Sequence, residues 1–190
     1  MKSAMAISHP AEAKKRLFHL IQTKALFKEK VILSSGKESN FYLDGRLVSL
    51  SAEGAYLIAL IILDLIAKKR ISAIGGPTLG ADPIAGAVAV LSHIRKKPVN
   101  TFIVRKAPKA HGRMRQIEGP LLKRGSRVIL LDDVATTGKA LIEAKQVLEN
   151  QGIEVKEAIV VVDREEGAGQ ALAGCGLRLI SIFKASDFGV

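Results

Sequence analysis

Short apolar runs alternate with longer amphipathic stretches along this chain, and the alternation predicts an α/β fold. The runs are apolar on both faces, as in strands buried inside a parallel sheet; they lie at residues 71–75, 99–104, 127–131, 157–162 and 177–183. Apolar residues recur at helical spacing in other stretches, which lie at residues 10–27, 52–69, 84–94, 138–150 and 169–173. We therefore expect a doubly wound, mostly parallel sheet of about five strands, flanked by helices.

The whole chain, residues 1–190, is expected to form one domain. A chain of 190 residues can bury a full α/β core, and a hydrophobic content of 48% excludes a disordered chain. Residues 1–50 are predicted to form an N-terminal helix and a small hood, because residues 31–44 have the pattern of two short strands around a polar Ser-Gly turn. Residues 51–190 are predicted to form the α/β core.

The chain is strongly basic, with a net charge of +11 that raises nucleic acid as a partner. The basic residues lie in separate clusters, however, and aromatic residues make up only 4% of the chain, too few for a platform that stacks bases. Two of the clusters, Lys68–Arg70 and Arg95–Lys97, lie at the C-termini of predicted helices, where basic side chains complement the helix dipole. The charge therefore favours anionic small-molecule substrates over a specific nucleic acid.

Neither a membrane segment nor an internal disulfide is expected. The longest apolar run, residues 55–67, is interrupted by Asp64 and is too short to span a bilayer. The one cysteine, Cys175, has no partner for an internal disulfide, which fits a reducing compartment. We therefore expect a cytoplasmic protein with no membrane partner, in which Cys175 is structural.

The densest candidate chemistry lies where the apolar run at residues 127–131 meets Asp132 and Asp133. Ligands of open α/β sheets bind outside the carboxyl ends of the strands, so the strand delivers both acids to a ligand crevice. The following turn, Thr136–Gly138, offers hydroxyls and backbone N–H groups at a helix N-terminus, which favours a phosphate. Two adjacent carboxylates can accept hydrogen bonds from two sugar hydroxyls, so the pattern predicts a site for a phosphorylated sugar. The alternative is a strand that ends in an exposed acidic turn.

The segment at residues 128–140 resembles the phosphoribosyl-pyrophosphate (PRPP) motif of type I phosphoribosyltransferases. The resemblance implies the type I phosphoribosyltransferase fold. It implies that Asp132 and Asp133 are catalytic residues that hold the ribose hydroxyls. It also implies that the 5′-phosphate is bound by the residues of the following turn, which are Ala135, Thr136, Thr137, Gly138 and Lys139.

A second group of candidate residues lies in the polar loop at residues 105–119, where four potential cations occur close together: Arg105, Lys106, Lys109 and His111. A pyrophosphate leaving group requires cations as its charge develops, and a loop that closes would exclude water from the reacting centre. The string resembles the catalytic loop of orotate phosphoribosyltransferases, whose pattern is Arg-Lys-x-x-Lys-x-His-Gly. The resemblance implies that Arg105 binds substrate and that the other three are catalytic. The alternative is a solvated basic loop.

Arg164 is the candidate for binding the base. It follows a predicted strand end, where its planar guanidinium could bind a carboxylate through two hydrogen bonds. The segment at residues 163–167 is similar to one in orotate phosphoribosyltransferases whose arginine contacts orotate, and this implies the same role for Arg164. The alternative is an ordinary surface ion pair between Arg164 and Asp163.

Two further segments match the same family. Residues 33–42 resemble its N-terminal segment, which packs over the pyrimidine, and this implies that Phe41 and Tyr42 bind substrate. Thr78 lies in the segment that matches the pyrophosphate loop, where Leu79-Gly80 stand in place of the Tyr-Lys of some members. We therefore expect Thr78 and nearby backbone N–H groups to bind pyrophosphate without a lysine.

The resemblance covers about residues 30–183 and implies an orotate phosphoribosyltransferase. Such an enzyme is a pentosyltransferase that converts orotate and PRPP into orotidine 5′-monophosphate and pyrophosphate, in de novo pyrimidine biosynthesis. No side-chain set resembles a closed metal site, so Mg²⁺ is expected to arrive bound to PRPP. The resemblance also implies a homodimer whose active sites are shared between subunits.

Two alternative functions remain open. Some proteins with this fold are nucleotide-sensing regulators of transcription, but they usually carry a DNA-reading module, and no helix-turn-helix pattern precedes residue 30. The chain could also be a phosphoribosyltransferase for another base. Arg164 and the loop at residues 105–111 argue instead for an acidic pyrimidine.

Overall fold

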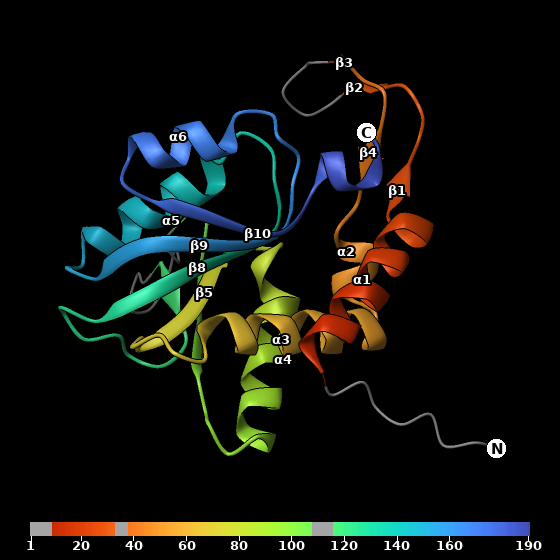
Figure 1. The fold of residues 1–190 in the computed structure, drawn as a ribbon. Coiled ribbons are helices and arrows are strands. Elements are labelled where there is room, and N and C mark those ends of the chain that lie inside the picture. The colour runs from red at the N-terminus through yellow and green to blue at the C-terminus, as the bar shows by residue number, and fades with distance from the viewer. Residues whose placement is uncertain (1–8, 33–37, 108–115) are drawn as a thin grey trace.

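The computed structural model describes residues 9–32, 38–107 and 116–190 (Figure 1). A six-stranded sheet forms its centre, with the strands in the order β10-β9-β8-β5-β6-β7. Five of these strands are parallel, and β7 pairs antiparallel with β6. The strands are β5 (Ala73–Pro77), β6 (Asn100–Val104), β7 (Ile117–Glu118), β8 (Arg127–Ala135), β9 (Glu154–Asp163) and β10 (Arg178–Lys184). The mostly parallel sheet predicted from the apolar runs is confirmed.

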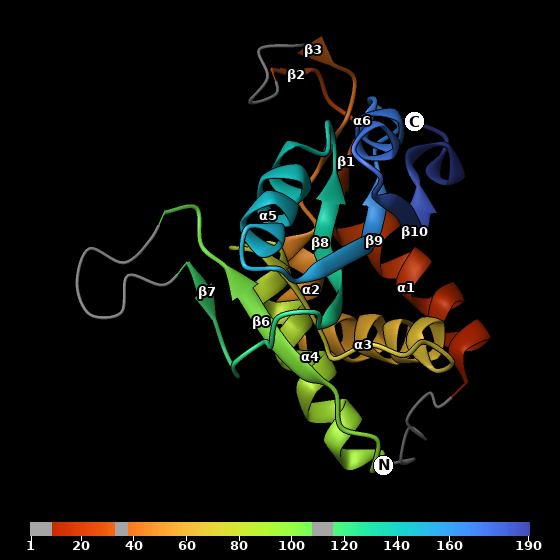
Figure 2. The same ribbon diagram turned by 90° about the vertical axis from the view of Figure 1, so that its left-hand side faces the viewer.

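Helices cover both faces of this sheet, as Figures 1 and 2 show. One face packs against α1, α3 and α4, and the other packs against α5 and α6. The helices are α1 (Pro10–Lys24), α2 (Arg46–Ser49), α3 (Ala52–Ile66), α4 (Ala81–Ile94), α5 (Lys139–Glu149) and α6 (Ala168–Gly174), with a 3-10 helix, η1 (Ala185–Phe188), near the C-terminus. Within the described residues, no helix combines the length and the apolar character that crossing a bilayer requires.

The central strand β8 explains why the predicted strands have no polar face. Its side chains alternate between the two layers: Val128 and Leu130 are buried beside α5 and α6, whereas Ile129 and Leu131 are buried beside α1, α3 and α4. Each of these four side chains is at most 2% exposed. Burial on both faces therefore requires the continuous apolar run that identifies the strand in the sequence.

Several predicted boundaries are wrong by a few residues, and one of these errors matters for the site. The strand predicted to end at Leu131 continues through both acids to Ala135. Its backbone pairs with β9 along this whole length, up to Ala135 opposite Asp163, and backbone pairing does not depend on side-chain polarity. Pairing with β5 stops at Leu130, opposite Gly75. Beyond Leu130, the β5 side of β8 is therefore unpaired, and a crevice opens there.

The short strand β7 is another difference between the predicted and the observed elements, because it lies in a segment predicted to be a loop. Two residues are too few to produce a recognisable period in the sequence. Its pairing places Ile117 opposite Val104 and Glu118 opposite Ile103. Residues 108–115 lie outside the described residues. The strand therefore fixes where the polar loop returns to the sheet.

The predicted hood is confirmed as two small antiparallel pairs. Strand β1 (Leu26–Phe27) pairs with β4 (Tyr42–Leu43), and β2 (Val31–Ile32) pairs with β3 (Glu38–Ser39). The first of these strands was expected to belong to the N-terminal helix, which instead ends at Lys24. Figure 2 shows β2 and β3 beyond the ends to which the β8 and β9 arrows point. The hood therefore stands at the carboxyl end of the sheet.

Candidate active site

Asp132 and Asp133 lie on β8 where its β5 side is unpaired, at the carboxyl end of the sheet. The carboxylate of Asp132 accepts a hydrogen bond from the backbone N–H of Asp133, at 3.0 Å. The carboxylate of Asp133 accepts one from the N–H of Val134, at 2.8 Å. Two consecutive backbone N–H groups of β8 thus hold the carboxylates in place.

Burial dominates the electrostatics of this pair. Burial raises the pKa of the Asp132 carboxyl well above its ordinary value, and the neighbouring charge of Asp133 raises it further. Burial also raises the pKa of Asp133, although the positive charge of Arg46 partly offsets this effect. Two desolvated acids side by side favour a ligand that donates hydrogen bonds and carries positive charge. The alternative of an exposed acidic turn is therefore wrong.

Two glycines make room for these carboxylates. A methyl group on Gly80 would overlap a carboxylate oxygen of Asp132 and one of Asp133. A methyl group on Gly45 would lie 2.9 Å from the other oxygen of Asp133. A side chain at either position would therefore require the carboxylates to move from the places they occupy here.

Two adjoining hollows form the crevice. One, of about 630 Å³, has Asp133 in its wall, together with the base of the hood and the segment Thr78–Gly80. The other, of about 460 Å³, has Asp132 in its wall and follows the turn from Val134 into α5. Lys106, Val134 and Thr136 line both hollows. An extended ligand can therefore lie across both acids.

The turn after β8 has the predicted form. All five residues that the PRPP motif implicates, Ala135, Thr136, Thr137, Gly138 and Lys139, line the second hollow. Gly138 is the N-cap of α5 with φ +79°, a left-handed conformation that favours glycine. Because Gly138 has no side chain, the first N–H groups of α5 are not covered by the N-cap residue. The turn can therefore bind a phosphate through backbone donors and the helix dipole.

Only part of the predicted catalytic loop is described. Lys106 lines both hollows, and Arg105 forms an ion pair of 3.6 Å with Glu118 on β7. The backbone of Arg105 also donates a hydrogen bond to the carbonyl of Gln116, at 2.8 Å. Lys109 and His111 lie outside the described residues. The start of the loop is thus fixed to β7, with Lys106 at the crevice.

Arg164 is buried rather than on the surface, and its side chain is 4% exposed. One carboxylate oxygen of Glu166 accepts a hydrogen bond from Nε of Arg164, at 2.8 Å, and lies 2.7 Å from Nη2 of Arg164. The Phe41 ring covers the guanidinium, with the carbon Cζ 4.3 Å from the ring centre. The alternative of an ordinary surface ion pair with Asp163 is therefore wrong. The structure brings the predicted base-binding residues Arg164 and Phe41 together.

The other two predicted substrate residues have different surroundings. Tyr42 stacks on Phe27 within the hood, with ring centres 6.2 Å apart. The Thr78 hydroxyl donates a hydrogen bond to Asp82 at the start of α4, at 2.8 Å, and Thr78 lines the first hollow. Thr78 is thus at the crevice with its hydroxyl held by Asp82.

Three residues near the site were missed from the sequence. Glu166 holds Arg164, and its place two residues further along the same turn was a signal that could have revealed it. Arg46 and Asp44 line the first hollow and pair with each other, with Arg46 Nε 3.0 Å from the carboxylate of Asp44. No motif pointed to this pair, because only the fold brings the segment before α2 to the acids.

No resident metal site is evident in the described parts of the chain, where no three His, Cys, Asp or Glu side chains are grouped as ligands. The carboxylates that line the crevice are those of Asp132, Asp133, Asp44 and Glu143. Asp44 already pairs with Arg46. These residues suit a hydrated cation carried in by a ligand better than an ion held by the protein alone.

Comparison with known proteins identifies relatives over nearly the whole chain. The phosphoribosyl transferase domain model matches residues 52–182. An orotate phosphoribosyltransferase of Synechocystis is 40% identical over 185 residues, which are 97% of this chain and 93% of that protein. One of Aquifex aeolicus is 45% identical over 155 residues, 82% of this chain and 84% of that protein. The relatives therefore match the chain in length as well as in sequence.

Solved structures agree with this result. The orotate phosphoribosyltransferase of Mycobacterium tuberculosis H37Rv in complex with Fe(III) dicitrate has a TM-score of 0.81 and 36% identity. The same enzyme in complex with PRPP has a TM-score of 0.77 and 34% identity. Each comparison covers 94% of this chain and 99% of the other. The chain belongs to the orotate phosphoribosyltransferase family, with the type I phosphoribosyltransferase fold.

Proposed function

We propose that this chain transfers the 5-phosphoribosyl group of PRPP to orotate, giving orotidine 5′-monophosphate and pyrophosphate in de novo pyrimidine biosynthesis. The observation that carries the proposal is the placement of Asp132 and Asp133. The two acids lie between a turn suited to a phosphate and a hollow large enough for the rest of the ligand. Family membership supports the choice of orotate as the base.

The two acids are proposed to hold the ribose. Their oxygens accept hydrogen bonds from the two ribose hydroxyls, while the turn Ala135–Lys139 holds the 5′-phosphate. As pyrophosphate leaves C1 of the ribose, the ring gains positive charge, which two buried carboxylates stabilise. Little covalent chemistry is left to the protein, so the positions of the charges determine the rate.

The pyrophosphate end of the ligand is proposed to lie between Thr78 and the loop that begins at Arg105. Lys106 faces both hollows and supplies positive charge there. Lys109 and His111, further along the loop, are proposed as additional cations. Backbone N–H groups next to Gly80 take the place of the lysine side chain that some family members carry at this position.

Arg164 and Phe41 are proposed to select the base. The aromatic ring and the guanidinium are in contact, so a flat acidic ring could stack on one while its carboxylate pairs with the other. Glu166 holds the guanidinium by its Nε edge and fixes its orientation. Tyr42 supports Phe27 in the hood, and we propose that it also lines the base site.

Mg²⁺ is proposed to enter the site bound to PRPP. When bound, the ion would neutralise part of the charge on pyrophosphate and so improve it as a leaving group. Asp132 and Asp133 are the residues able to contact its water shell. The ion would otherwise be held by the substrate's own oxygens, as suits a cation that keeps most of its water.

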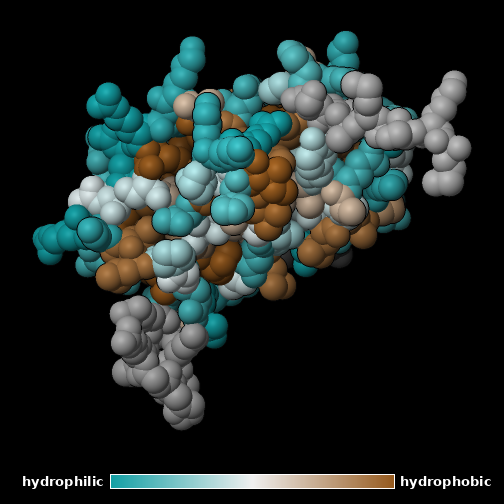
Figure 3. All heavy atoms as spheres, turned by 90° about the horizontal axis from the view of Figure 1, so that it is seen from below, coloured by the Kyte–Doolittle hydropathy of each residue, from teal (hydrophilic) through white to brown (hydrophobic). Residues whose placement is uncertain are grey.

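A homodimer with shared active sites is proposed as the working form. The support is an apolar surface on α4 and beside α2: Val90 is 63% exposed, Ile94 66% and Leu50 71%. Brown apolar patches also lie between polar side chains on the underside of the molecule (Figure 3). Exposed apolar area of this kind is typical of association surfaces. We propose a cytoplasmic location, which the single cysteine and the metabolite substrates support.

A panel of bases tests the substrate directly. Purified protein, PRPP and Mg²⁺ are mixed with orotate, uracil, adenine or hypoxanthine, and the loss of each base is followed by absorbance or chromatography. We expect orotate alone to be consumed, with pyrophosphate formed in equal amount. Turnover of another base, with orotate inert, would refute the assignment.

A further inference from the structure

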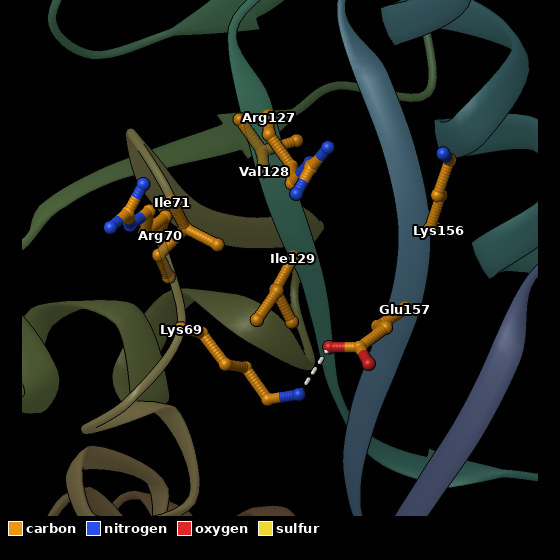
Figure 4. Close-up of a pocket in the computed structure, with 8 residues that line it drawn as sticks. All are labelled: Lys69, Arg70, Ile71, Arg127, Val128, Ile129, Lys156 and Glu157. Atoms are coloured by element: carbon orange, nitrogen blue, oxygen red, sulfur yellow. Dashed lines mark ion pairs between the residues drawn. The ribbon is translucent and has the colours of Figure 1, made fainter.

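A second cavity, of about 240 Å³, lies at the opposite end of the sheet from the crevice (Figure 4). It is lined by three separate segments: Lys69–Ile71 after α3, Arg127–Ile129 at the start of β8, and Lys156–Glu157 near the start of β9. The crevice, by contrast, surrounds the last residues of β8. Leu130 and Leu131 of β8 therefore lie between the segments that line the two sites.

The wall of this cavity has an excess of positive charge. Four cations line it, Lys69, Arg70, Arg127 and Lys156, with one carboxylate, that of Glu157. Just outside, the Glu154 carboxylate pairs with both Arg127 and Lys156, and Arg178 adds a fifth cation by pairing with Glu157. Among the described residues, five cations thus lie with two carboxylates, an excess of three positive charges.

The individual ion pairs show which cations are committed. Lys69 is 2.7 Å from Glu157 (dashed in Figure 4), and the side chains of this pair are only 26% and 19% exposed. Arg127 shares Glu154 with Lys156, at 3.2 and 2.6 Å. Arg70 has no ion pair with any described residue. Arg70 and Arg127 are therefore the cations with most capacity to bind a further anion.

Helix dipoles do not account for this charge. Lys69 and Arg70 follow the C-terminus of α3, which ends at Ile66, and part of their charge complements that helix. Arg127 and Lys156 lie on β-strands, however, where no helix ends beside them in sequence. A hollow that shares Lys69 continues the basic surface with Arg95 and Lys97 against one acid, Asp64. The surplus therefore extends beyond the cavity.

The floor of the cavity limits the kind of ligand. Ile71 and Ile129 form it, and none of the described lining residues is aromatic. Such a floor excludes water and strengthens charge interactions at the rim, but it offers no platform on which successive bases of a nucleic acid would stack. The size suits a small organic anion rather than a polymer strand.

We propose that this cavity binds a small molecule with adjacent phosphate groups, such as a nucleoside triphosphate, whose phosphates contact Arg70 and Arg127 and whose apolar part covers the isoleucine floor. The site is distinct from the crevice and does not depend on the transferase reaction.

Binding is measured by calorimetry at constant ionic strength, with ATP, tripolyphosphate and adenosine as probes. ATP should bind, tripolyphosphate should bind more weakly, and adenosine should not bind, because the charge provides most of the affinity and the floor adds to it. Equal binding of ATP and tripolyphosphate would restrict the proposal to the phosphates and overturn the role of the floor. A tighter complex with a single-stranded oligonucleotide than with ATP would overturn the choice of a small ligand.

Two matched variants locate the site. Arg70→Gln/Arg127→Gln should weaken ATP binding about tenfold or more. Lys68→Gln/Lys123→Gln removes the same amount of charge from exposed residues outside the cavity and should change ATP binding little. Thermal unfolding checks that both variants fold. Failure of wild type to bind ATP, or an equal loss in both variants, would overturn the site, whatever the result with orotate and PRPP.

Discussion

The guanidinium carbon of Arg164 lies 4.3 Å from the centre of the Phe41 ring. Arg164 follows the last residue of β9, whereas Phe41 lies in the hood just before β4. The contact therefore joins the hood to the carboxyl end of the sheet. It brings together the cation and the aromatic ring that are proposed to select the base, although neither residue lines the two hollows at the acids.

The first prediction concerns Arg164→Lys, which keeps the charge but loses the planar group that binds a carboxylate through two hydrogen bonds. We expect the apparent affinity for orotate to fall about tenfold and that for PRPP to change much less. Steady-state titration of each substrate, with the other saturating, measures the two effects separately. An equal loss for both substrates would indicate that Arg164 supports the fold through Glu166 rather than binding the base.

Gly80→Ala is predicted to impair activity far more than stability. The added methyl group overlaps carboxylate oxygens of Asp132 and Asp133, so the acids must turn away from the ribose position. We expect turnover to fall at least tenfold. The control is Gly174→Ala at the end of α6, away from the proposed association surface on α4, where nothing lies within 4 Å of the added Cβ. That variant should keep full turnover and gain about 0.5–1 kcal/mol of stability. Normal turnover of Gly80→Ala would contradict the close approach.

The stability of Asp132→Asn should depend on pH in a defined direction. Burial raises the pKa of Asp132 in the folded state, so its contribution is fully present below the ordinary aspartate pKa and is lost as pH rises through the raised value. The asparagine of the variant does not ionise, so the variant does not lose stability in this way as pH rises. We expect its midpoint of thermal unfolding to exceed that of wild type at neutral pH by about 2–4 °C, which corresponds to about 1 kcal/mol.

Below the ordinary aspartate pKa of about 3.9, the two proteins should unfold at the same temperature. Asp64→Asn, on the exposed side of α3, serves as the control for the same substitution made away from the crevice. A variant that is less stable than wild type at neutral pH would show that the Asp132 carboxylate is favourably paired, contrary to the burial described above.

The fold was largely predictable because burial on both faces imposes a continuous apolar run on each central strand. Strands β8 and β9 therefore stand out in the sequence, whereas β7 does not, since its two residues carry no period. The end of β8 was missed because Asp132 and Asp133 have polar side chains but ordinary backbone pairing with β9. The crevice opens beside these two residues, where β8 is no longer paired with β5.

The candidate site was predictable where its residues are adjacent in sequence, as in the segment from Asp132 to Lys139. It was not predictable where the fold assembles it. Nothing in the sequence indicates that the backbone at Gly80 lies against the two carboxylates, or that Arg46 lies near enough to Asp133 to affect its pKa. The burial of Arg164 was also missed, because its partners Glu166 and Phe41 are contributed by a turn and by the hood.

The proposed shared site predicts complementation between two inactive variants. Lys109→Ala damages the loop and Arg164→Ala damages the base site; if the loop serves the neighbouring subunit, a mixed dimer has one intact site. Random exchange makes half of the dimers mixed, so activity should recover to roughly a quarter of wild type. Absence of recovery, with subunit exchange shown by mass spectrometry, would mean that each loop serves its own subunit.

The central claim is that the two acids of β8 carry the transfer of phosphoribose to orotate. The most direct measurement compares orotate consumption, in the presence of PRPP and Mg²⁺, by wild type and by Asp132→Asn/Asp133→Asn, with folding of both verified by circular dichroism. Wild type should consume orotate. The rate for the variant should be lower by about a hundredfold or more, because amides keep the shape of the carboxylates but lose their charge. Near-normal turnover by the folded variant would contradict the account.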